Sequence, residues 1–431
     1  MMGALLKYCS ANDARLMVAK TTYNKNGFQA TADATDPVYY APEVMPYLVT
    51  GHINLGGAID FLADSNVLPT AKNPVSGFAS ATAPGIHAVI PAVKIALQCT
   101  ASLKGAEGKM LFSTGALTKR NYIMRKSGQV AISEHNIGAL FVDTLQNPPA
   151  IRQLERMGDS LGFYDEGDFY TTESVTRGFR PAALQFGDIH AEKMEAENMA
   201  KMMAEIRKYQ PINIILHDVL DFSSRNHHNI KDCTFIFSQH IAQNTVRKDI
   251  QLVAGVLDDI ANCISQGHSG VVHIIESNHD LAINTWLKNA DFKADPVNAV
   301  TYLECMLATY RAIQAGDHGF NMLEHAYKNL AGGTSPNIVF HKTDESVIIA
   351  NTEMGCHGHS GINGSRGSPA QFRTMGIPMN TGHTHTPSIM GACYTAGVAA
   401  SLEMGYNVGP SSWRLANILT WPNGQRQIIF M

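Results

Sequence analysis

Five short motifs rich in Asp, Asn and His lie in the second half of the chain, and each follows a segment predicted to be a β-strand. In open α/β sheets, the loops beyond the carboxyl ends of the strands gather at one edge. We therefore expect the five motifs to converge on one point although they are far apart in sequence. In chain order they are Asp188-x-His190, His217-Asp218-Val219-Leu220-Asp221, Ser277-Asn278-His279-Asp280, His357-Gly358-His359 and Gly382-His383-Thr384-His385.

A strand–helix rhythm underlies this expectation. Short apolar runs predict strands at 182–186, 212–216, 271–275, 337–341 and 346–351, and a closing hairpin at 417–430 around Pro422-Asn423-Gly424. Helices are predicted at 191–208, 298–313 and 320–330. A further long helix is predicted where apolar residues recur at helical spacing: Val246, Ile250, Val253, Leu257, Ile260 and Ile264.

The motif residues are ligands for hard or borderline divalent metals. Asp188 and His190 are two residues apart, so in extended backbone they face the same side and can bind one ion together. Asp218 is the candidate for a bridging carboxylate, because two cations ~3.5–4 Å apart need an anion between them. Asp221 is expected to orient its loop. Taken alone, each of these motifs also fits an ordinary polar loop.

The third motif adds a neutral ligand and a catalytic candidate. The amide oxygen of Asn278 limits the negative charge at a second ion, and His279 beside it is placed to meet a substrate. Asp280 is the candidate partner that fixes the tautomer of His279. A helix N-cap would also explain Ser277, Asn278 and Asp280, but it would not explain His279.

The set of motifs, in this order over residues 188–385, resembles the calcineurin-like metallophosphoesterases, whose motifs run D-x-H, G-D-x-x-D, G-N-H-[DE], H and G-H-x-H. The resemblance implies a sandwich of two mixed β-sheets flanked by helices. It also implies in-line attack on phosphorus by a metal-bound hydroxide. Two residues depart from the family pattern, because His217 and Ser277 stand where glycine is usual.

The resemblance further implies which residues hold the ions. One ion would take Asp188, His190, His385 and the shared Asp218, and the other would take Asn278, His357, His383 and the same Asp218. His357 is chosen from the fourth motif, with His359 as the reserve. Mn²⁺ is the favoured metal, and Mg²⁺, Fe²⁺ or Zn²⁺ would also suit oxygen and nitrogen ligands. His279 and Asp280 would be the catalytic pair.

The first half of the chain has a different character, and we expect a smaller α+β domain at 1–178 before a metallophosphoesterase domain at 179–431. Its predicted strands are 93–99, 109–113, 129–133 and 138–142, and helical cues follow at 150–156. A basic stretch with Tyr at 115–126 would suit a nucleic-acid backbone or a solvated hairpin. The opening residues read as the middle of a folding unit, so we expect the natural chain to extend upstream.

Two loops beside the motifs carry arginine among small polar residues, a composition suited either to phosphate oxygens or to a solvated loop. The candidate substrate-binding residues are Arg225, Asn226, His227 and Arg366. The sequence around these residues resembles phage-encoded early DNases of the same superfamily. These DNases are in turn similar to the Mre11 repair nucleases of that superfamily. We therefore expect a metal-dependent phosphodiesterase that hydrolyses DNA. The alternatives are a phosphatase or a cyclic-nucleotide or other small-molecule phosphodiesterase, and a phage host-takeover binding protein on the same fold.

Composition sets looser bounds. At 431 residues, with 45% hydrophobic residues and a net charge of −4, the chain can form a large core but has no overall basic field. Seven Cys without a C-x-x-C pair indicate reduced thiols in a cytoplasm, the host cytoplasm if the chain is phage-encoded. No apolar run approaches ~20 residues, so we expect no membrane partner. The expected partner is DNA, and a homo-oligomer is compatible with the sequence.

Overall fold

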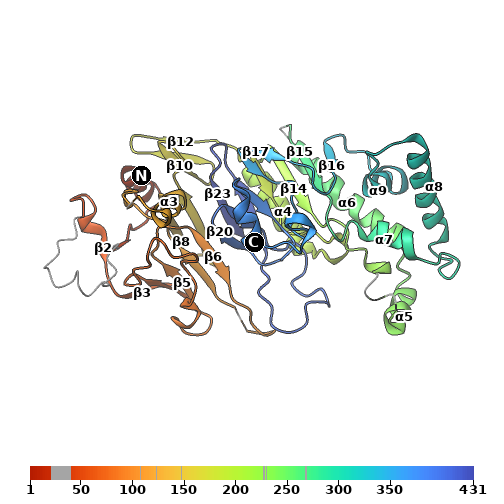
Figure 1. Ribbon diagram of the computed structural model, residues 1–431, viewed down its shortest axis with the longest axis horizontal. Helices are drawn as coiled ribbons and strands as arrows, with labels where there is room; N and C mark the ends of the chain where they lie inside the picture. Colours follow the sequence, from red (N-terminus) through yellow and green to blue (C-terminus); the bar gives the residue numbers. More distant parts are fainter. Residues whose placement is uncertain are drawn as a thin grey trace.

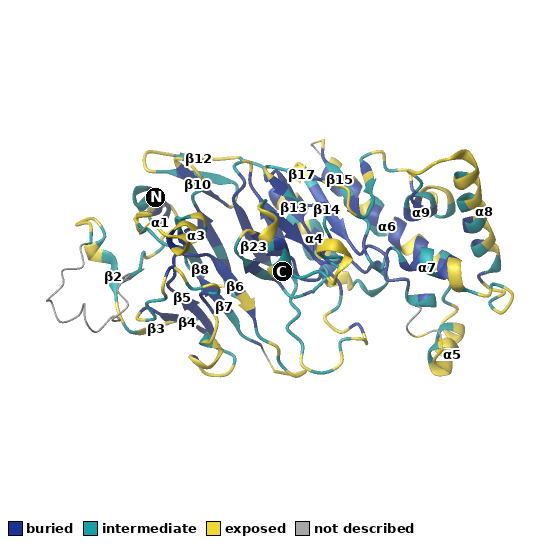
Figure 2. Cartoon of the chain, in the orientation of Figure 1, coloured by how far each residue is buried: buried dark blue, intermediate teal, exposed yellow. Residues whose placement is uncertain are grey.

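The computed structural model describes residues 1–20, 40–106, 108–122, 124–146, 148–226, 229, 231–266 and 269–431. The molecule is elongated, with the N-terminal strands at one end and the helices that follow the third motif at the other (Figure 1). The larger of the two main β-sheets includes N-terminal strands, and the strands of both sheets form much of the buried interior (Figure 2). None of the helices among the described residues combines the length and the apolar character needed to cross a bilayer.

A six-stranded sheet carries the first three motifs. Its strands, in spatial order, are β16 (Ile338–His341), β15 (Val271–Ile275), β14 (Asn213–His217), β13 (Ala183–Gln185), β22 (Ala416–Thr420) and β23 (Arg426–Phe430). The strands β13 to β16 are parallel, and the hairpin β22–β23 is antiparallel. The strands predicted for these segments and the closing hairpin are therefore confirmed.

Helices cover one face of this sheet. The helices α4 (Ala196–Tyr209) and α6 (Val246–Ser265) pack on it, and α7 (Ala282–Asn289), α8 (Ala299–Ala315) and α9 (Met322–His325) continue the layer. A further helix, α5 (Cys233–Ile241), projects beside α7 in Figure 1. The apolar residues predicted to line one face of α6 are all buried in this core: Val246, Ile250, Val253, Leu257, Ile260 and Ile264.

The opposite face of the six-stranded sheet packs on a ten-stranded sheet. Side chains alternate along β14: Ile214 and Leu216 face the helices, whereas Ile215 packs with Val347 and Met354 of the second layer. The strands of this second sheet, in spatial order, are β17 (Ile348–Ile349), β18 (Thr352–Glu353), β19 (Met379–Thr381), β21 (Cys393–Thr395), β20 (Ser388–Met390), β6 (Ala96–Cys99), β7 (Met110–Ser113), β5 (His87–Ile90), β4 (Ile59–Leu62) and β3 (His52–Gly56). The expected sandwich of two mixed sheets flanked by helices is confirmed.

The ten-stranded sheet joins residues from both sides of position 178. Leu97 of β6 pairs with Ile389 of β20. Strands from the first half of the chain therefore lie in the same sheet as strands from the second half. The division into units at 1–178 and 179–431 stays a prediction. The two stretches both contribute strands to this sheet. The N-terminal part also contains α1 (Met2–Ala11) and the strands β1 (Val18–Ala19), β2 (Leu48–Val49), β8 (Gly138–Asp143), β9 (Ala150–Glu155), β10 (Gly162–Asp165), β11 (Asp168–Thr171) and β12 (Val175–Thr176).

Two local predictions in the first half are wrong. The helix predicted at 150–156 is instead the strand β9, whose six residues pair with β8. This strand is fixed by distant contacts, because the side chain of Gln153 accepts a hydrogen bond from Ile428 N at 2.9 Å and its carbonyl accepts one from Gln427 at 3.0 Å. The strand predicted at 129–133 is instead part of the helix α3 (Lys126–Ser133).

A buried polar cluster ties the N-terminus to the C-terminal hairpin. The carboxylate of Asp165, 1% exposed, accepts hydrogen bonds from Arg152 at 2.7 and 2.8 Å, from Tyr8 at 2.8 Å and from Gln427 at 3.0 Å. These residues lie on β10, β9, α1 and β23. A single buried carboxylate therefore links four elements that are distant in sequence.

We predict that Asp165→Ala lowers the free energy of unfolding by about 3–5 kcal/mol, because the buried guanidinium of Arg152 loses both hydrogen bonds to Asp165 and keeps only the 3.4 Å ion pair with the more exposed Glu166. Denaturant unfolding measures this loss. The control is Asp168→Ala, which removes a pair 3.8 Å from Arg177, whose side chain is 84% exposed, and should cost about 1 kcal/mol or less. Similar losses in both variants would show that the cluster contributes no more than a surface pair.

Candidate metal centre

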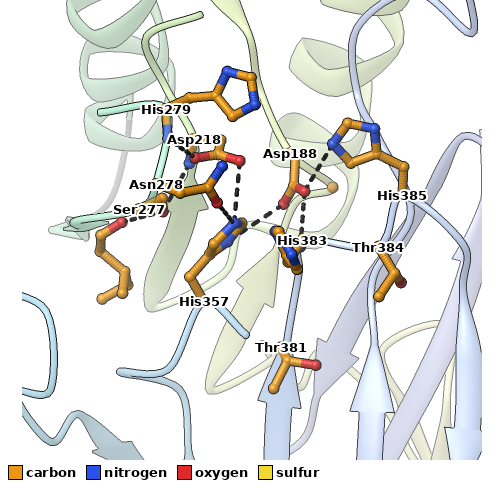
Figure 3. A network of polar contacts seen from close by, with 12 residues as sticks. Asp188, Asp218, Ser277, Asn278, His279, His357, Thr381, His383, Thr384 and His385 are labelled. Carbon is orange, nitrogen blue, oxygen red and sulfur yellow. Dashed lines mark hydrogen bonds and ion pairs between the residues drawn. The ribbon is translucent and has the colours of Figure 1, made fainter. Parts of the chain in front are cut away.

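The five motifs meet at one end of the two sheets. Asp188, Asp218 and Asn278 follow β13, β14 and β15 at the carboxyl ends of the parallel strands. His357 follows β18, and the fifth motif follows β19, both in the ten-stranded sheet. Figure 3 shows these side chains pointing toward one another from both layers. The centre is therefore built across the junction of the sandwich.

Four of the predicted ligands form one compact group. Asp188, His190, Asp218 and His385 are all buried, and each offers a ligand atom within 4.8 Å of the others. His385 Nε2 lies 3.1 Å from Asp188 Oδ2, and His190 Nε2 lies 4.0 Å from Asp218 Oδ2. The two imidazole Nε2 atoms lie 3.1 Å apart. This group can hold a metal ion.

The tautomer of His190 supports that assignment. Its Nδ1 lies 3.2 Å from Asp221 Oδ1, so the carboxylate favours the proton on Nδ1. The Nε2 lone pair then faces His385 and the two carboxylates. A carboxylate behind an imidazole is the usual arrangement behind a metal-binding histidine. Asp221 therefore does more than orient its loop.

The other predicted ligands gather around His357, which also contacts Asp218. His357 Nε2 lies 3.1 Å from Asp218 Oδ2 and 3.0 Å from Asn278 Oδ1. The His383 ring lies 5.2 Å from the His357 ring, measured between centroids. His359 lies farther out, with its ring centroid 5.5 Å from that of His357, and no ion pair joins its ring to Asp188 or Asp218 among the described residues. The geometry thus favours His357 over His359.

The backbone at the centre is strained. His190, Asp218, His383 and His385 have φ values of +39°, +44°, +72° and +54°, in the left-handed region that side-chain-bearing residues rarely adopt. Such conformations cost ~1–3 kcal/mol each and persist where the surrounding fold imposes them. The fold thus maintains an unfavourable backbone to direct these four side chains inward.

The negative charges of the buried carboxylates are balanced by neighbouring histidines. Burial raises the pKa of a carboxyl group, but His357 and His385 more than offset it and hold the pKa of Asp188 at about 2. His357 likewise holds the pKa of Asp218 well below its usual value despite burial. Burial and the charge of His357 lower the pKa of His383 to about 4. The carboxylates are therefore anionic, and His383 is neutral with a free lone pair.

His279 lies beside this group but is oriented by Asp221, not by Asp280. Its Nδ1 lies 3.3 Å from Asp221 Oδ1, and its side chain is 21% exposed. Burial lowers the pKa of His279, but Asp221 and Asp218 raise it to a net value of about 9. The expected partnership with Asp280 is wrong, because the two oxygens of Asp280 accept hydrogen bonds from Leu220 N and Ser277 N, both at 3.0 Å.

The predicted substrate-binding residues differ in whether they are available to contact a phosphate. Arg225 makes two hydrogen bonds to Asp295, at 2.6 and 2.8 Å, and this carboxylate neutralises its charge, contrary to the expectation of a phosphate contact. Arg366 is exposed on a turn beside His359. Asn226 is half-buried next to Arg225, and His227 lies outside the described residues.

Sequence reasoning missed two aromatic residues at the rim. The Trp413 ring packs edge-on against the His385 ring, with centroids 4.2 Å apart, and the Tyr406 ring lies 6.0 Å from that of His279. Both belong to the long loop between β21 and β22. A Trp and a Tyr in a Gly- and Ser-rich loop shortly after the last motif are the only sequence signal for them.

Gly382 allows a direct test of the centre, because a Cβ at this position would lie 2.3 Å from Asp188 Oδ1 and 3.2 Å from His357 Nδ1. We predict that Gly382→Ala displaces the Asp188 carboxylate and weakens Mn²⁺ binding by ~10- to 100-fold, the usual effect of disturbing the support of a ligand. Titration calorimetry measures the affinity.

The control is Gly255→Ala, because a Cβ there meets nothing within 4 Å in the helix α6. It should leave Mn²⁺ affinity unchanged. Thermal unfolding without metal shows whether the Gly382 variant is folded. A folded Gly382 variant with normal affinity would exclude Asp188 as a ligand.

Comparison with known proteins identifies one similar phage protein. No family model matches the chain, and no solved structure matches it. The chain is similar to Protein A1 of Escherichia phage T5, with 42% identity over an alignment of 448 positions that covers 99% of this chain and 78% of the phage protein. Identity at this level over nearly the whole chain shows common descent, so the chain belongs to the family of the phage T5 protein A1.

Proposed function

We propose that the chain is a metal-dependent phosphodiesterase of the calcineurin-like metallophosphoesterase superfamily, and that its substrate is DNA. The observation that carries the proposal is the position of Asp218 between two sets of ligands. His190 Nε2, in the group with Asp188 and His385, lies 4.0 Å from Asp218 Oδ2, and His357 Nε2, which also contacts Asn278, lies 3.1 Å from the same oxygen. A carboxylate so placed suits two cations that share one ligand.

The proposal assigns these residues to two such ions, and two observations support the first of them. The buried Asp188 Oδ1 has no hydrogen-bond partner among the described residues, and a buried carboxylate oxygen without a partner is costly. The Nε2 atoms of His190 and His385 lie 3.1 Å apart, so both imidazoles could bind one ion through these atoms when neither nitrogen carries a proton. Asp188, His190, His385 and Asp218 would hold one ion, and Asn278, His357, His383 and Asp218 the other. Mn²⁺ suits this mixture of oxygen and imidazole ligands.

When bound, such ions polarise the phosphoryl oxygens and lower the pKa of a nucleophilic water. The chain's own contribution to the chemistry is His279. Its partly exposed ring lies 4.7 Å from the ring of His190, measured between centroids, and is oriented by Asp221. A protonated imidazole there would stabilise the developing negative charge on the phosphoryl oxygens and donate a proton to the leaving oxygen.

DNA as the substrate is supported by the surroundings of the centre. Arg366 is exposed on the turn that follows His359, where it would meet a phosphate beside the scissile one. The relative is a phage protein, and DNA in the host cytoplasm is the substrate that we propose. Arg225 is a weaker candidate for such a contact, since its ion pair with Asp295 would have to open.

The first test is a substrate panel with Mn²⁺: linear DNA, circular DNA, RNA, bis-p-nitrophenyl phosphate and a phosphomonoester. We expect hydrolysis of DNA, and loss of most activity with weaker binding of both ions in Asp218→Asn. Hydrolysis of the small diester alone would indicate a small-molecule phosphodiesterase in place of the proposed nuclease. Hydrolysis of the monoester alone would indicate a phosphatase. Absence of turnover on every substrate would favour a binding protein.

The second test separates His279 from the ligands. We predict that His279→Ala retains both metal ions while turnover falls by ~10²–10⁴-fold, the range for a positioned acid–base group. Metal content by elemental analysis and single-turnover rates measure the two effects. His240→Ala is the control, since this histidine lies on α5, outside the motifs. Loss of metal from the His279 variant would make His279 a ligand and contradict its role as a proton donor.

A further inference from the structure

An aromatic pair borders the candidate metal centre on the side of His279 and His385. The rings of Tyr406 and Trp413 lie 5.8 Å apart at 64°, and each also contacts one histidine of the centre. Trp413 meets His385 at a centroid distance of 4.2 Å, and Tyr406 meets His279 at 6.0 Å. Aromatic surface therefore continues outward from the place where we propose that the scissile phosphate lies.

The loop that carries Tyr406 is held in shape by its own contacts. Met404 is buried in a small core with Val398 and Ala400, which anchors the loop from below. The side chain of Asn407 donates to Leu402 O at 2.7 Å and accepts from Met404 N at 3.2 Å, which closes the turn. The phenol of Tyr406 donates to the sulfur of Met404 at 2.8 Å. These contacts fix the position of the ring.

Tyr406 nevertheless remains 46% exposed, although a large aromatic ring gains more from burial. Its anchored loop prevents it from folding into the core, so one part of the ring stays open to solvent beside the centre. A flat ring held in this way next to a phosphate site is the arrangement by which proteins stack an unpaired base.

We propose that Tyr406 and Trp413 form a stacking subsite for the base of a nucleotide next to the phosphate at the metal centre. The inference rests on the proposed function, because it takes the substrate to be a nucleic-acid strand. Stacking requires a base that is free of its duplex partner. The subsite therefore selects single-stranded segments or frayed ends, and it tolerates all four bases because each has an aromatic face.

The two residues do not contribute in the same way. Trp413 packs edge-on against a proposed ligand, so its replacement would also disturb His385. Tyr406 contacts His279 only through a wider ring-to-ring separation, and its half-exposed position allows replacement without loss of the fold. Tyr406 is therefore the residue on which the proposal is tested.

The test compares two strands of equal length with phosphorothioate linkages, which slow hydrolysis. One carries all its bases, and the other carries none but has the same number of phosphates. Binding to the Mn²⁺-loaded protein is measured by fluorescence anisotropy. We expect the wild type to bind the base-containing strand ~5- to 150-fold more tightly, the range for stacking of one base.

Tyr406→Leu should bring this ratio close to one, and Tyr406→Phe should keep it, because the ring is retained. Tyr310→Leu is the matched control, since Tyr310 is a 62% exposed tyrosine on α8 and should leave the ratio unchanged. An unchanged ratio in Tyr406→Leu overturns the proposal. Equal binding of the two strands by the wild type overturns it as well.

Failure of the subsite and failure of the proposed function give different results. A wild-type protein that hydrolyses DNA but binds both strands equally keeps the nuclease and loses the subsite. A protein that distinguishes the strands through Tyr406 but hydrolyses neither natural DNA nor RNA keeps the subsite and loses the nuclease.

Discussion

Two buried carboxylates at the junction of the sheets impose the main constraint on this structure. Asp188 and Asp218 come from neighbouring parallel strands, and both are 1% exposed or less. Like charges in a low-dielectric interior repel strongly, so they require positive charge nearby. Imidazoles surround them on both sides, which keeps both carboxyl groups ionised. The arrangement is costly for a polypeptide alone and suits a site that receives divalent cations.

Much of the fold and of the centre could be predicted because the relevant signals are local. Each parallel strand is a short apolar run, and each motif follows such a run directly. The spacing of apolar residues in 246–264 predicts both the existence and the buried face of α6. Since parallel strands end at one edge, placing the motifs after strands is enough to bring Asp188, Asp218 and Asn278 together.

Three of the errors arise where a contact joins residues far apart in the chain. Asp280 is adjacent to His279 in sequence, but the carboxylate of Asp221 reaches the ring from another loop. Arg225 looks like a free cation in its loop, but Asp295 pairs with it from 70 positions farther along the chain. Residues 150–155 have no strong strand signal, and their pairing with β8 and contact with β23 decide their conformation. None of these partners is visible in a local pattern.

Two residues depart from the glycines of the superfamily pattern, and both support the proposed bridging site. The Ser277 hydroxyl donates to Ile275 O at 2.7 Å and accepts from Asp218 N at 3.0 Å, which holds the Asp218 backbone in its unusual conformation. The His217 ring is fully buried, and its centroid lies 5.3 Å from that of His357. Burial and the charge of His357 lower the pKa of His217 to about 3, so it adds no positive charge that would oppose a bound cation. The side chain that replaces glycine therefore places a neutral, fully buried ring beside a proposed ligand.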